Sequence, residues 1–161
     1  MRFYQIDIKH FLAFLLCLTL ASANAFEATV VGITDGDTIT VLDSRKTQHK
    51  IRLAGIDAPE KGQDFGNKSK EHLSDLVYKK VVNIPDNKLD RYGRIVSRVF
   101  VGSTDASLEM IKAGMAWHFK KYQHEQSLED RLSYNAAEVE ARKAKVGLWS
   151  NGVAKRPEDF R

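Results

Sequence analysis

The sequence predicts an α+β fold that consists mainly of β-strands, in which a five-stranded barrel is capped by about three helices. Two patterns lead to this expectation. Five short segments carry β-branched residues with alternating polarity, and three longer segments carry apolar residues at helical spacing. The chain has 161 residues, of which 43% are hydrophobic, so one domain with one core is expected.

The five predicted strands span residues 26–33, 37–42, 48–53, 81–85 and 94–101. A Thr-Asp-Gly turn separates the first two strands, and a short polar turn separates the second from the third. Polar and apolar residues alternate from Thr38 to Leu42 and from His49 to Leu53, which indicates strands with one buried face. We expect the second and third strands to be neighbours.

The three predicted helices span residues 65–80, 107–113 and 128–145. Leu73, Leu76 and Val77 share one face of the first helix. Gly114 is expected to end the second helix and Gly147 the third, because glycine commonly follows the last helical residue. The candidate core positions of the last helix are Leu132, Ala136, Val139 and Ala141.

The order of these elements is typical of one kind of barrel. Five short strands, with helices inserted and appended, match an OB-type barrel capped by helices. Trp149 lies just beyond the last predicted helix and is expected to pack back on the body of the domain.

Residues 1–25 have the pattern of a signal peptide. A polar start containing two basic residues precedes an apolar run at residues 11–20, and Ala23 and Ala25 occupy the small-residue positions that a signal peptidase needs. Cleavage after Ala25 leaves residues 26–161 as one mature domain, exported to a periplasm or secreted. The alternative is an uncleaved membrane anchor, although the run is short for a membrane span.

The single cysteine, Cys17, lies inside the predicted signal peptide. A lipoprotein site requires a small residue before the cysteine, and Leu16 precedes it, so the sequence does not favour lipidation. Cleavage as predicted leaves no thiol, which excludes thiol catalysis and disulfides in the mature domain.

Charge alone decides little about function. The chain has 25 Lys and Arg against 21 Asp and Glu, a formal net charge of +4. A basic surface attracts phosphate backbones, but so small an excess is also typical of a solvated surface without a nucleic-acid partner.

Three polar clusters at turns beside the strands carry the chemical information. They are Asp-Gly-Asp-Thr at residues 35–38, Gly-Ile-Asp-Ala-Pro-Glu at residues 55–60 and Asp-Arg-Tyr-Gly-Arg at residues 90–94. Each cluster taken singly is also explained as ordinary turn chemistry.

Together the clusters indicate a cation and phosphate site. Asp37 and Asp57 lie beside neighbouring strands and can converge, and two carboxylates with a backbone carbonyl suit a hard cation such as calcium. Arg52 and Arg94 can face a phosphate, because guanidinium makes bidentate bonds to phosphate. Glu60 would supply the base.

The same three clusters, in this order and spacing, resemble the staphylococcal nuclease-like (thermonuclease) family. The resemblance continues through Leu-Glu-Met-Ile-Lys-Ala-Gly-Met-Ala from Leu108 and the closing Gly-Leu-Trp-Ser from Gly147. It therefore covers nearly all of residues 26–150, and the motifs lie in register with the strand and helix pattern.

For the metal, the resemblance implies that Asp37 and Asp57 bind Ca²⁺ with help from the main-chain carbonyl of Ala58. Many members of the family have Thr where this chain has Ala58, but a backbone contact tolerates the difference. Asp35 is implied to brace the metal-binding turn from behind.

For catalysis, the resemblance implies that Arg52 and Arg94 grip the phosphate and that Glu60 is the general base. Tyr92 matches a tyrosine beside the bound nucleotide. Tyr122 is the candidate for a second stacking position, because His-Phe-Lys-Lys-Tyr at residues 118–122 replaces a tyrosine-rich stretch of the family. The segment after Glu60 is shorter than the mobile loop of the best-known member, and that loop contributes basic contacts to the substrate.

The resemblance implies a calcium-dependent, sugar-non-specific nuclease that hydrolyses phosphodiester bonds of DNA and RNA and leaves 3′-phosphorylated products. Single strands are favoured, because a splayed base can stack on Tyr92. A monomer is expected, with no protein partner and no stable membrane insertion after signal cleavage.

Two other classes of function stay open. The first is a non-catalytic OB-type module that binds single-stranded nucleic acid. The second is an exported structural or partner-binding domain whose charged residues form surface pairs. The chain keeps all five acidic and arginine positions of the expected site, which favours catalysis. It has no His-Glu-x-x-His and no Gly-x-Ser-x-Gly pattern, so zinc-protease and serine-hydrolase chemistry are not favoured.

Overall fold

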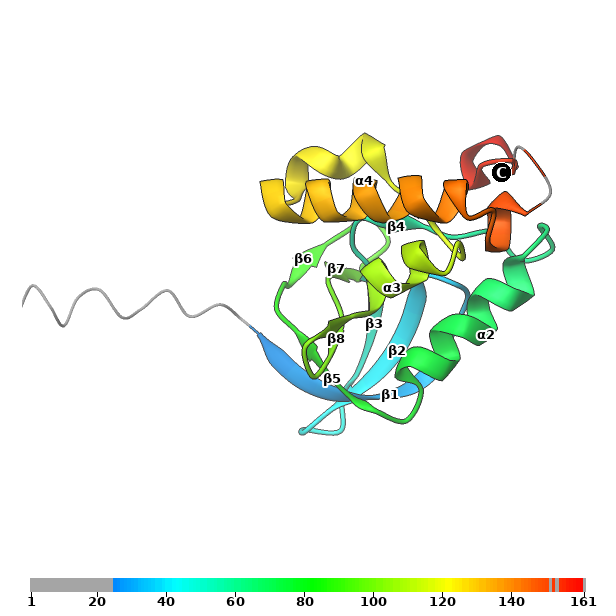
Figure 1. Ribbon diagram of the computed structural model, residues 1–161. Helices are drawn as coiled ribbons and strands as arrows, with labels where there is room; N and C mark the ends of the chain where they lie inside the picture. Colours follow the sequence, from blue (N-terminus) through cyan, green and yellow to red (C-terminus); the bar gives the residue numbers. More distant parts are fainter. Residues whose placement is uncertain (1–24, 151, 153, 161) are drawn as a thin grey trace, which may run out of the picture.

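A computed structural model describes residues 25–150, 152 and 154–160 (Figure 1). The predicted signal peptide falls outside these residues except for its last residue, Ala25, so its cleavage stays a prediction. Within the part of the chain that is described, no helix combines the length and the apolar character needed to cross a membrane.

In the described part of the chain, eight strands form one sheet in the order β6-β7-β3-β2-β1-β5-β8-β9. These strands are β1 (Phe26–Ile33), β2 (Thr38–Asp43), β3 (Gln48–Leu53), β5 (Val81–Ile84), β6 (Lys88–Leu89), β7 (Ile95–Ser97), β8 (Phe100–Val101) and β9 (Thr104–Asp105). A small second sheet pairs β4 (Ile56–Asp57) with β10 (Trp117–His118). The first four predicted strands lie within a residue of β1, β2, β3 and β5.

The prediction of one continuous strand at residues 94–101 is wrong, because the chain changes partner inside it. β7 pairs in parallel with β3, through Ile51 opposite Ile95, whereas β8 pairs antiparallel with β5, through Asn83 opposite Phe100. Only residues 98–99 separate β7 from β8, which lie near opposite ends of the sheet. The sheet must therefore curl until its two sides approach, which gives the predicted barrel.

The described helices cover the barrel at one end and along one side (Figure 1). They are α2 (Gly66–Val77), α3 (Ala106–Lys112) and α4 (Leu128–Lys143), with 3-10 turns η2 (Lys120–Glu125), η3 (Gly147–Trp149) and η4 (Pro157–Asp159). In this view α4 runs across the top of the barrel, α3 lies beneath it, and α2 lies to the side. The expected α+β architecture with about three helices is confirmed.

Local chemistry sets the ends of α2 and α3. The helix α2 stops at Val77, three residues earlier than predicted, because Tyr78 is extended and Lys79 adopts a φ of 60°. The helix α3 begins after Asp105, whose carboxylate accepts hydrogen bonds from the backbone N–H groups of Ser107 and Leu108.

Three of the four predicted core positions of α4 are wrong, because they are exposed: Leu132, Ala136 and Val139. The buried face is instead formed by Tyr134, Ala137, Glu138 and Ala141. The Tyr134 hydroxyl donates to Asp105 Oδ2 at 2.6 Å. The buried face of α4 therefore includes polar contacts, which a search for apolar residues in the sequence does not detect.

The buried side chains form two groups. The larger group fills the barrel and includes the inward faces of β1, β2 and β3. The smaller group joins Trp117, Ala141, Leu148 and Trp149 at the end of α4, where the two indole rings meet edge to face at 5.8 Å. Trp149 thus packs back on the body as predicted.

The predicted glycine stop at Gly114 is confirmed. Gly114 has a φ of 65°, and a Cβ at this position would lie 2.4 Å from the carbonyl oxygen of Val146. The carbonyl of Gly114 also accepts a hydrogen bond from the Leu148 N–H at 2.8 Å. A side chain here would push the C-terminal segment away from the turn that leads into β10.

Candidate active site

Two carboxylates converge on one guanidinium at the end of the β2–β3 hairpin. Arg52 Nη2 lies 3.1 Å from Asp37 Oδ2 and 3.2 Å from Asp57 Oδ1. The three side chains are nearly buried, with 12%, 10% and 5% of the Arg52, Asp37 and Asp57 side chains exposed. The structure therefore brings together the two acids that the sequence singled out as metal ligands.

The backbone explains this convergence. β2 and β3 pair with Thr38 opposite Arg52, and the Leu53 N–H donates to the Asp37 carbonyl at 2.8 Å. Asp57 comes from β4, which pairs with β10 so that Asp57 lies opposite Trp117. A residue far along the sequence thus fixes the strand that carries the second acid.

The Asp37 carboxylate is held from both sides. Its Oδ1 accepts from the Thr38 hydroxyl at 2.9 Å, and its Oδ2 accepts from the Ala58 N–H at 3.0 Å. Ala58 is buried and its backbone lies beside the Asp37 carboxylate, while the expected role of its carbonyl stays a prediction. Sequence reasoning gave Thr38 no role, although a hydroxyl directly after the acid was a visible signal.

Arg52 is fixed in this structure as an internal counter-ion. Its Nη1 donates to the backbone carbonyls of Leu53 at 2.8 Å and Ile56 at 2.9 Å, while Nη2 contacts both acids. Both terminal nitrogens therefore have partners inside the protein. The contact of Arg52 with phosphate stays a prediction.

Asp35 lies two residues before Asp37 in the same turn and adds negative electrostatic potential there. Its Oδ1 accepts from the Asp37 N–H at 3.1 Å. Burial, and then the neighbouring Asp37 carboxylate, raise the pKa of Asp35 to about 6. Gly36 seats this turn on α2, because a Cβ there would lie 1.9 Å from Ser69 Oγ. The site therefore concentrates acidic groups that a cation would stabilise.

The donor set fits a partly hydrated hard cation. Asp37 and Asp57 supply carboxylate oxygens, the ligands that calcium and magnesium prefer. Among the described residues, no three His, Cys, Asp or Glu side chains group closely enough to hold a metal by themselves. Backbone oxygens and waters would have to complete the coordination.

Arg94 comes immediately before β7, the strand that pairs with the Arg52 strand β3. β7 pairs in parallel with β3 so that Val96 lies opposite Arg52, and side chains two apart on a strand share a face. Arg94 precedes β7 by one residue and so belongs to the face that carries Arg52.

Asp90 orients Arg94, a role that sequence reasoning missed. Asp90 Oδ2 accepts from Arg94 Nε at 2.7 Å, and Oδ1 accepts from the N–H groups of Tyr92 and Arg94. Burial raises the pKa of Asp90, but these hydrogen bonds outweigh it, so the pKa lies below its ordinary value. The visible signal was an acid four residues before an arginine across a tight turn.

The two candidate stacking tyrosines lie in different surroundings. Tyr92 is 73% exposed, and the guanidinium carbons of Arg91 and Arg94 lie 5.6 and 5.4 Å from its ring centroid. Tyr122 lies on η2, where its ring contacts Phe119 at 5.1 Å and His124 at 6.3 Å. Tyr92 therefore lies beside Arg94. The ring contacts given for Tyr122, among the described residues, are with Phe119 and His124, which are close to it in the sequence.

Glu60 begins a loop that is tied to the C-terminal segment. It is half-buried and follows Asp57 by three residues. Its N–H donates to Gln63 Oε1 at 3.0 Å, and Gln63 Nε2 donates to the Lys155 carbonyl at 2.6 Å. Sequence reasoning missed Gln63, because its partner lies 92 residues away and no local pattern marks it.

Comparison with known proteins agrees with this geometry. The family described as staphylococcal nuclease homologue matches residues 50–151. The chain is 42% identical over 150 residues to a Haemophilus influenzae protein named "Uncharacterized endonuclease", over 91% of this chain and 81% of that protein. It is 36% identical over 158 residues to the "Micrococcal nuclease" of Shigella flexneri, over 92% and 88%. It is also 36% identical over 141 residues to "Protein ParB" of Escherichia coli, over 82% and 77%.

The matched segment contains Arg52, Asp57, Glu60, Asp90 and Arg94, and it extends across more than half of the chain. The alignments with the relatives cover most of both partners. This chain therefore belongs to the staphylococcal nuclease family.

Proposed function

We propose that this protein is an exported, calcium-dependent nuclease that hydrolyses phosphodiester bonds of both DNA and RNA and leaves 3′-phosphorylated products. Its family makes it a nuclease and therefore a hydrolase. The observation that carries the proposal is the convergence of Asp37 and Asp57 on Arg52, with Glu60 three residues after Asp57. Buried acids and an arginine at such short range form a site for a cation and a phosphate.

Asp37 and Asp57 would hold the calcium, with the Ala58 carbonyl as a third oxygen. Bound calcium supplies positive charge that stabilises the phosphate in the transition state and polarises a nearby water. The hydrogen bonds from Thr38 and Ala58 to Asp37 keep that carboxylate in place before any ligand arrives. Preorganised charge of this kind is usually the largest contribution to catalysis.

Glu60 would orient the attacking water and accept its proton. Carboxylates are weak bases at neutral pH, so positioning is expected to contribute more than proton abstraction. The hydrogen bond from the Glu60 N–H to Gln63 fixes the backbone at this point of the loop.

Arg94 would carry most of the phosphate contact. Its Nε is held by Asp90, and its two terminal nitrogens would make a bidentate contact with phosphate oxygens. Arg52 is held more tightly and would mainly offset negative charge around the reacting phosphate. Removal of such a positioned donor costs about 2.7–4 kcal/mol of transition-state stabilisation.

These contacts address phosphate and sugar, which position a nucleic acid without reading its bases. Both DNA and RNA are therefore proposed as substrates. Single strands are favoured, because the exposed ring of Tyr92 is available to a splayed base while Arg91 and Arg94 lie beside it.

The test is cleavage of a labelled single strand by the purified protein with calcium, magnesium or excess chelator. We expect calcium-dependent cutting that falls about 100-fold or more in Arg94→Ala and strongly in Glu60→Gln. Matched controls are Arg45→Ala, whose side chain is 83% exposed on the β2–β3 turn, and Glu71→Gln on the surface of α2. Both controls should keep full activity.

The same experiment tests the alternative, a module that binds single-stranded nucleic acid without cutting it. The barrel and the exposed Tyr92 would serve that function equally well. Intact substrate in every reaction of a folded protein, together with measurable binding, would replace the nuclease by this module. Products that carry a 5′-phosphate would contradict only the proposed polarity of cleavage.

Export to a periplasm or to the medium is part of the proposal and rests on the pattern of residues 1–25. Sequencing the N-terminus of the mature protein should give Phe26, and an intact Met1 would favour the uncleaved anchor. Light scattering of the same sample should give a monomer.

A further inference from the structure

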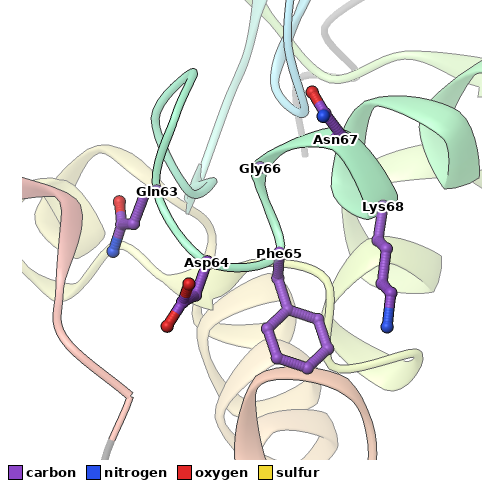
Figure 2. A pocket seen from close by; sticks show the side chains of 6 residues that line it. All are labelled: Gln63, Asp64, Phe65, Gly66, Asn67 and Lys68. Carbon is purple, nitrogen blue, oxygen red and sulfur yellow. The ribbon is translucent and has the colours of Figure 1, made fainter.

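Two adjoining hollows open beside the loop that follows Glu60. One lies at the start of α2 and is lined by residues 63–68 (Figure 2). The other has a volume of about 370 Å³ and lies between residues 62–65 and the C-terminal segment. The C-terminal wall of the second hollow is formed by Leu148, Ala154, Lys155 and Phe160.

Each hollow combines an aromatic ring with a lysine. Lys155 Nζ lies 5.6 Å from the ring centroid of Phe160, which is 43% exposed. Lys68 Nζ lies 4.9 Å from the ring centroid of Phe65, and Figure 2 shows both side chains extending from the start of α2 in the same direction. Asp64 adds one negative charge to the lining of both hollows, against the two lysines.

This combination suits one chemical class of ligand. Aromatic rings stack on nucleobases of any sequence, and lysines beside them hold the phosphate backbone. A cavity of about 300 Å³ or more accommodates a small organic ligand such as a nucleotide. The helix α2 also begins here without a side-chain cap and without an acidic residue in its first turn, so its N-terminal dipole adds to the attraction for phosphate.

The second hollow lies next to the backbone of Glu60. Gln63 accepts a hydrogen bond from the Glu60 N–H and donates one to the carbonyl of Lys155, so a single side chain connects the two places. A nucleic-acid strand bound at Glu60 would therefore have the second hollow beside it.

We propose that the second hollow, termed the C-terminal subsite, binds one further nucleotide of a single strand whose scissile phosphate lies at Glu60. The base packs against Phe160, and the adjacent phosphate lies between Lys155 and Lys68. This inference rests on the proposed nuclease function and adds a determinant of substrate length. It explains how a chain with a short loop after Glu60 gains grip on its substrate.

The test compares a dinucleotide, which is too short to reach the subsite, with a ten-nucleotide single strand. The variants are Phe160→Ala and the double variant Lys68→Gln/Lys155→Gln. We expect kcat/KM on the ten-nucleotide strand to fall about fivefold or more in each variant, the effect of losing one stacked base. Turnover of the dinucleotide should stay unchanged.

The matched control is Lys46→Gln/Lys70→Gln, which removes the same charge from two exposed lysines outside the hollows. This control should leave both substrates unaffected. Equal losses on the dinucleotide and the long strand would overturn the subsite, as would a control that loses as much as the lysine variant. Unchanged kcat/KM on the long strand would overturn it too.

Binding separates a failure of the subsite from a failure of the proposed function. Fluorescence anisotropy of both oligonucleotides with chelator present measures affinity when nothing is cut. If the wild-type protein cuts neither substrate, the nuclease proposal fails, and the subsite is then judged by affinity alone. Weaker binding of the long strand by Phe160→Ala supports it, and equal or undetectable binding by wild type and variant overturns it.

Discussion

Arg52 would couple the stability of the fold to the proposed binding of calcium. Its guanidinium contacts both Asp37 and Asp57, and the three side chains are nearly buried. Without a cation, this arginine is the positive charge that compensates the two acids. A cation between the same carboxylates would share that task, so arginine and metal compete electrostatically for them.

We therefore expect Arg52→Gln to destabilise the metal-free protein by about 3–5 kcal/mol, because it leaves buried charge without its partner. Calcium should restore more stability to this variant than to wild type, since a cation replaces the lost positive charge. Thermal unfolding with calcium and with chelator measures both effects. The same calcium-dependent rise in Tm for variant and wild type would contradict this coupling.

Asp90 is expected to act through Arg94. In Asp90→Asn the side-chain oxygen can still accept from the turn N–H groups, but the ion pair with Arg94 Nε is lost. We expect kcat/KM to fall about 10-fold or more with little change in Tm, because the guanidinium is no longer aimed. The double variant Asp90→Asn/Arg94→Ala should be no worse than Arg94→Ala alone, and fully additive losses would show that Asp90 acts independently.

At the scale of elements, α4 holds the small β4–β10 sheet, which carries Asp57, in place. Glu138 on the buried face of α4 accepts from the His118 N–H at 3.3 Å and pairs with Lys120 at 2.9 Å and Arg142 at 3.4 Å. His118 belongs to β10, and β10 pairs with β4. A carboxylate on the helix thus holds the strand that holds a proposed metal ligand.

Glu138 should make the stability of the fold sensitive to acid. Burial raises the pKa of Glu138, but its interactions with Lys120 and Arg142 outweigh burial and bring the pKa below the ordinary value of 4.5. A lowered folded-state pKa contributes stability above pH 4.5 that disappears as the pH falls through the folded-state value.

Glu138→Gln should therefore cost about 1.5–3 kcal/mol at neutral pH, the scale of hydrogen bonds to charged groups, and much less in acid. Denaturant unfolding at several pH values measures the difference. Glu140→Gln, on the exposed face of the same helix and paired with Lys143, is the control and should change little. A loss that is the same at every pH would show that packing, and not charge, explains the effect.

Gly36 positions the turn that contains Asp35 and Asp37 on α2. A Cβ at Gly36 would lie 1.9 Å from Ser69 Oγ and 2.8 Å from Ala58 Cβ, whereas one at Gly32 would meet Thr40 at an ordinary 3.5 Å. Gly36→Ala should cost about 1–3 kcal/mol through overpacking and also weaken calcium binding, because Asp35 and Asp37 flank the displaced turn. Gly32→Ala is the control. Calorimetry that finds equal calcium affinity in both variants would contradict the effect on the site.

Local patterns predicted the elements that have local causes. Alternation along β1 to β3 and the helical spacing of Leu73 and Val77 are properties of adjacent residues, and these elements lie where they were expected. The break between β7 and β8 was missed because it depends on which strands they meet. The polar inward face of α4 was missed because the partner of Tyr134 lies on α3's N-terminal cap.

The candidate site divides in the same way. The approach of Asp37 to Asp57 is predicted from the pairing of β2 with β3, although the pairing of β4 with the distant β10 also fixes Asp57. The compensating role of Arg52 and the Gln63 contact with Lys155 depend on folded geometry that no spacing rule describes. The residue types alone pointed to a hard cation such as calcium and to Glu60 as the base, whereas the role of Tyr92 as a stacking partner came from the family resemblance.

At the scale of the whole molecule, electrostatic attraction for nucleic acid should come from a few specific contacts and not from the net charge of the protein. The formal net charge is only +4, so the overall field cannot provide strong attraction for nucleic acid. The proposed phosphate contacts are few: Arg94 at the catalytic centre, Lys155 at the C-terminal subsite and Lys68 in the adjoining first hollow. The affinity for a single strand should therefore have a weak dependence on salt concentration, corresponding to about three phosphate contacts.

For single strands the logarithm of the binding constant falls with the logarithm of salt concentration by about 0.7 per phosphate contact, which predicts a slope of about −2 for wild type. Lys68→Gln/Lys155→Gln removes two contacts and should reduce the slope to about −0.7, whereas Lys46→Gln/Lys70→Gln should not change it. Anisotropy titrations of the ten-nucleotide strand across a range of salt concentrations, with chelator present, measure these slopes. A slope that both double variants reduce equally would mean that the nucleic acid responds to total charge, and the localised phosphate contacts proposed for this protein would have to be abandoned.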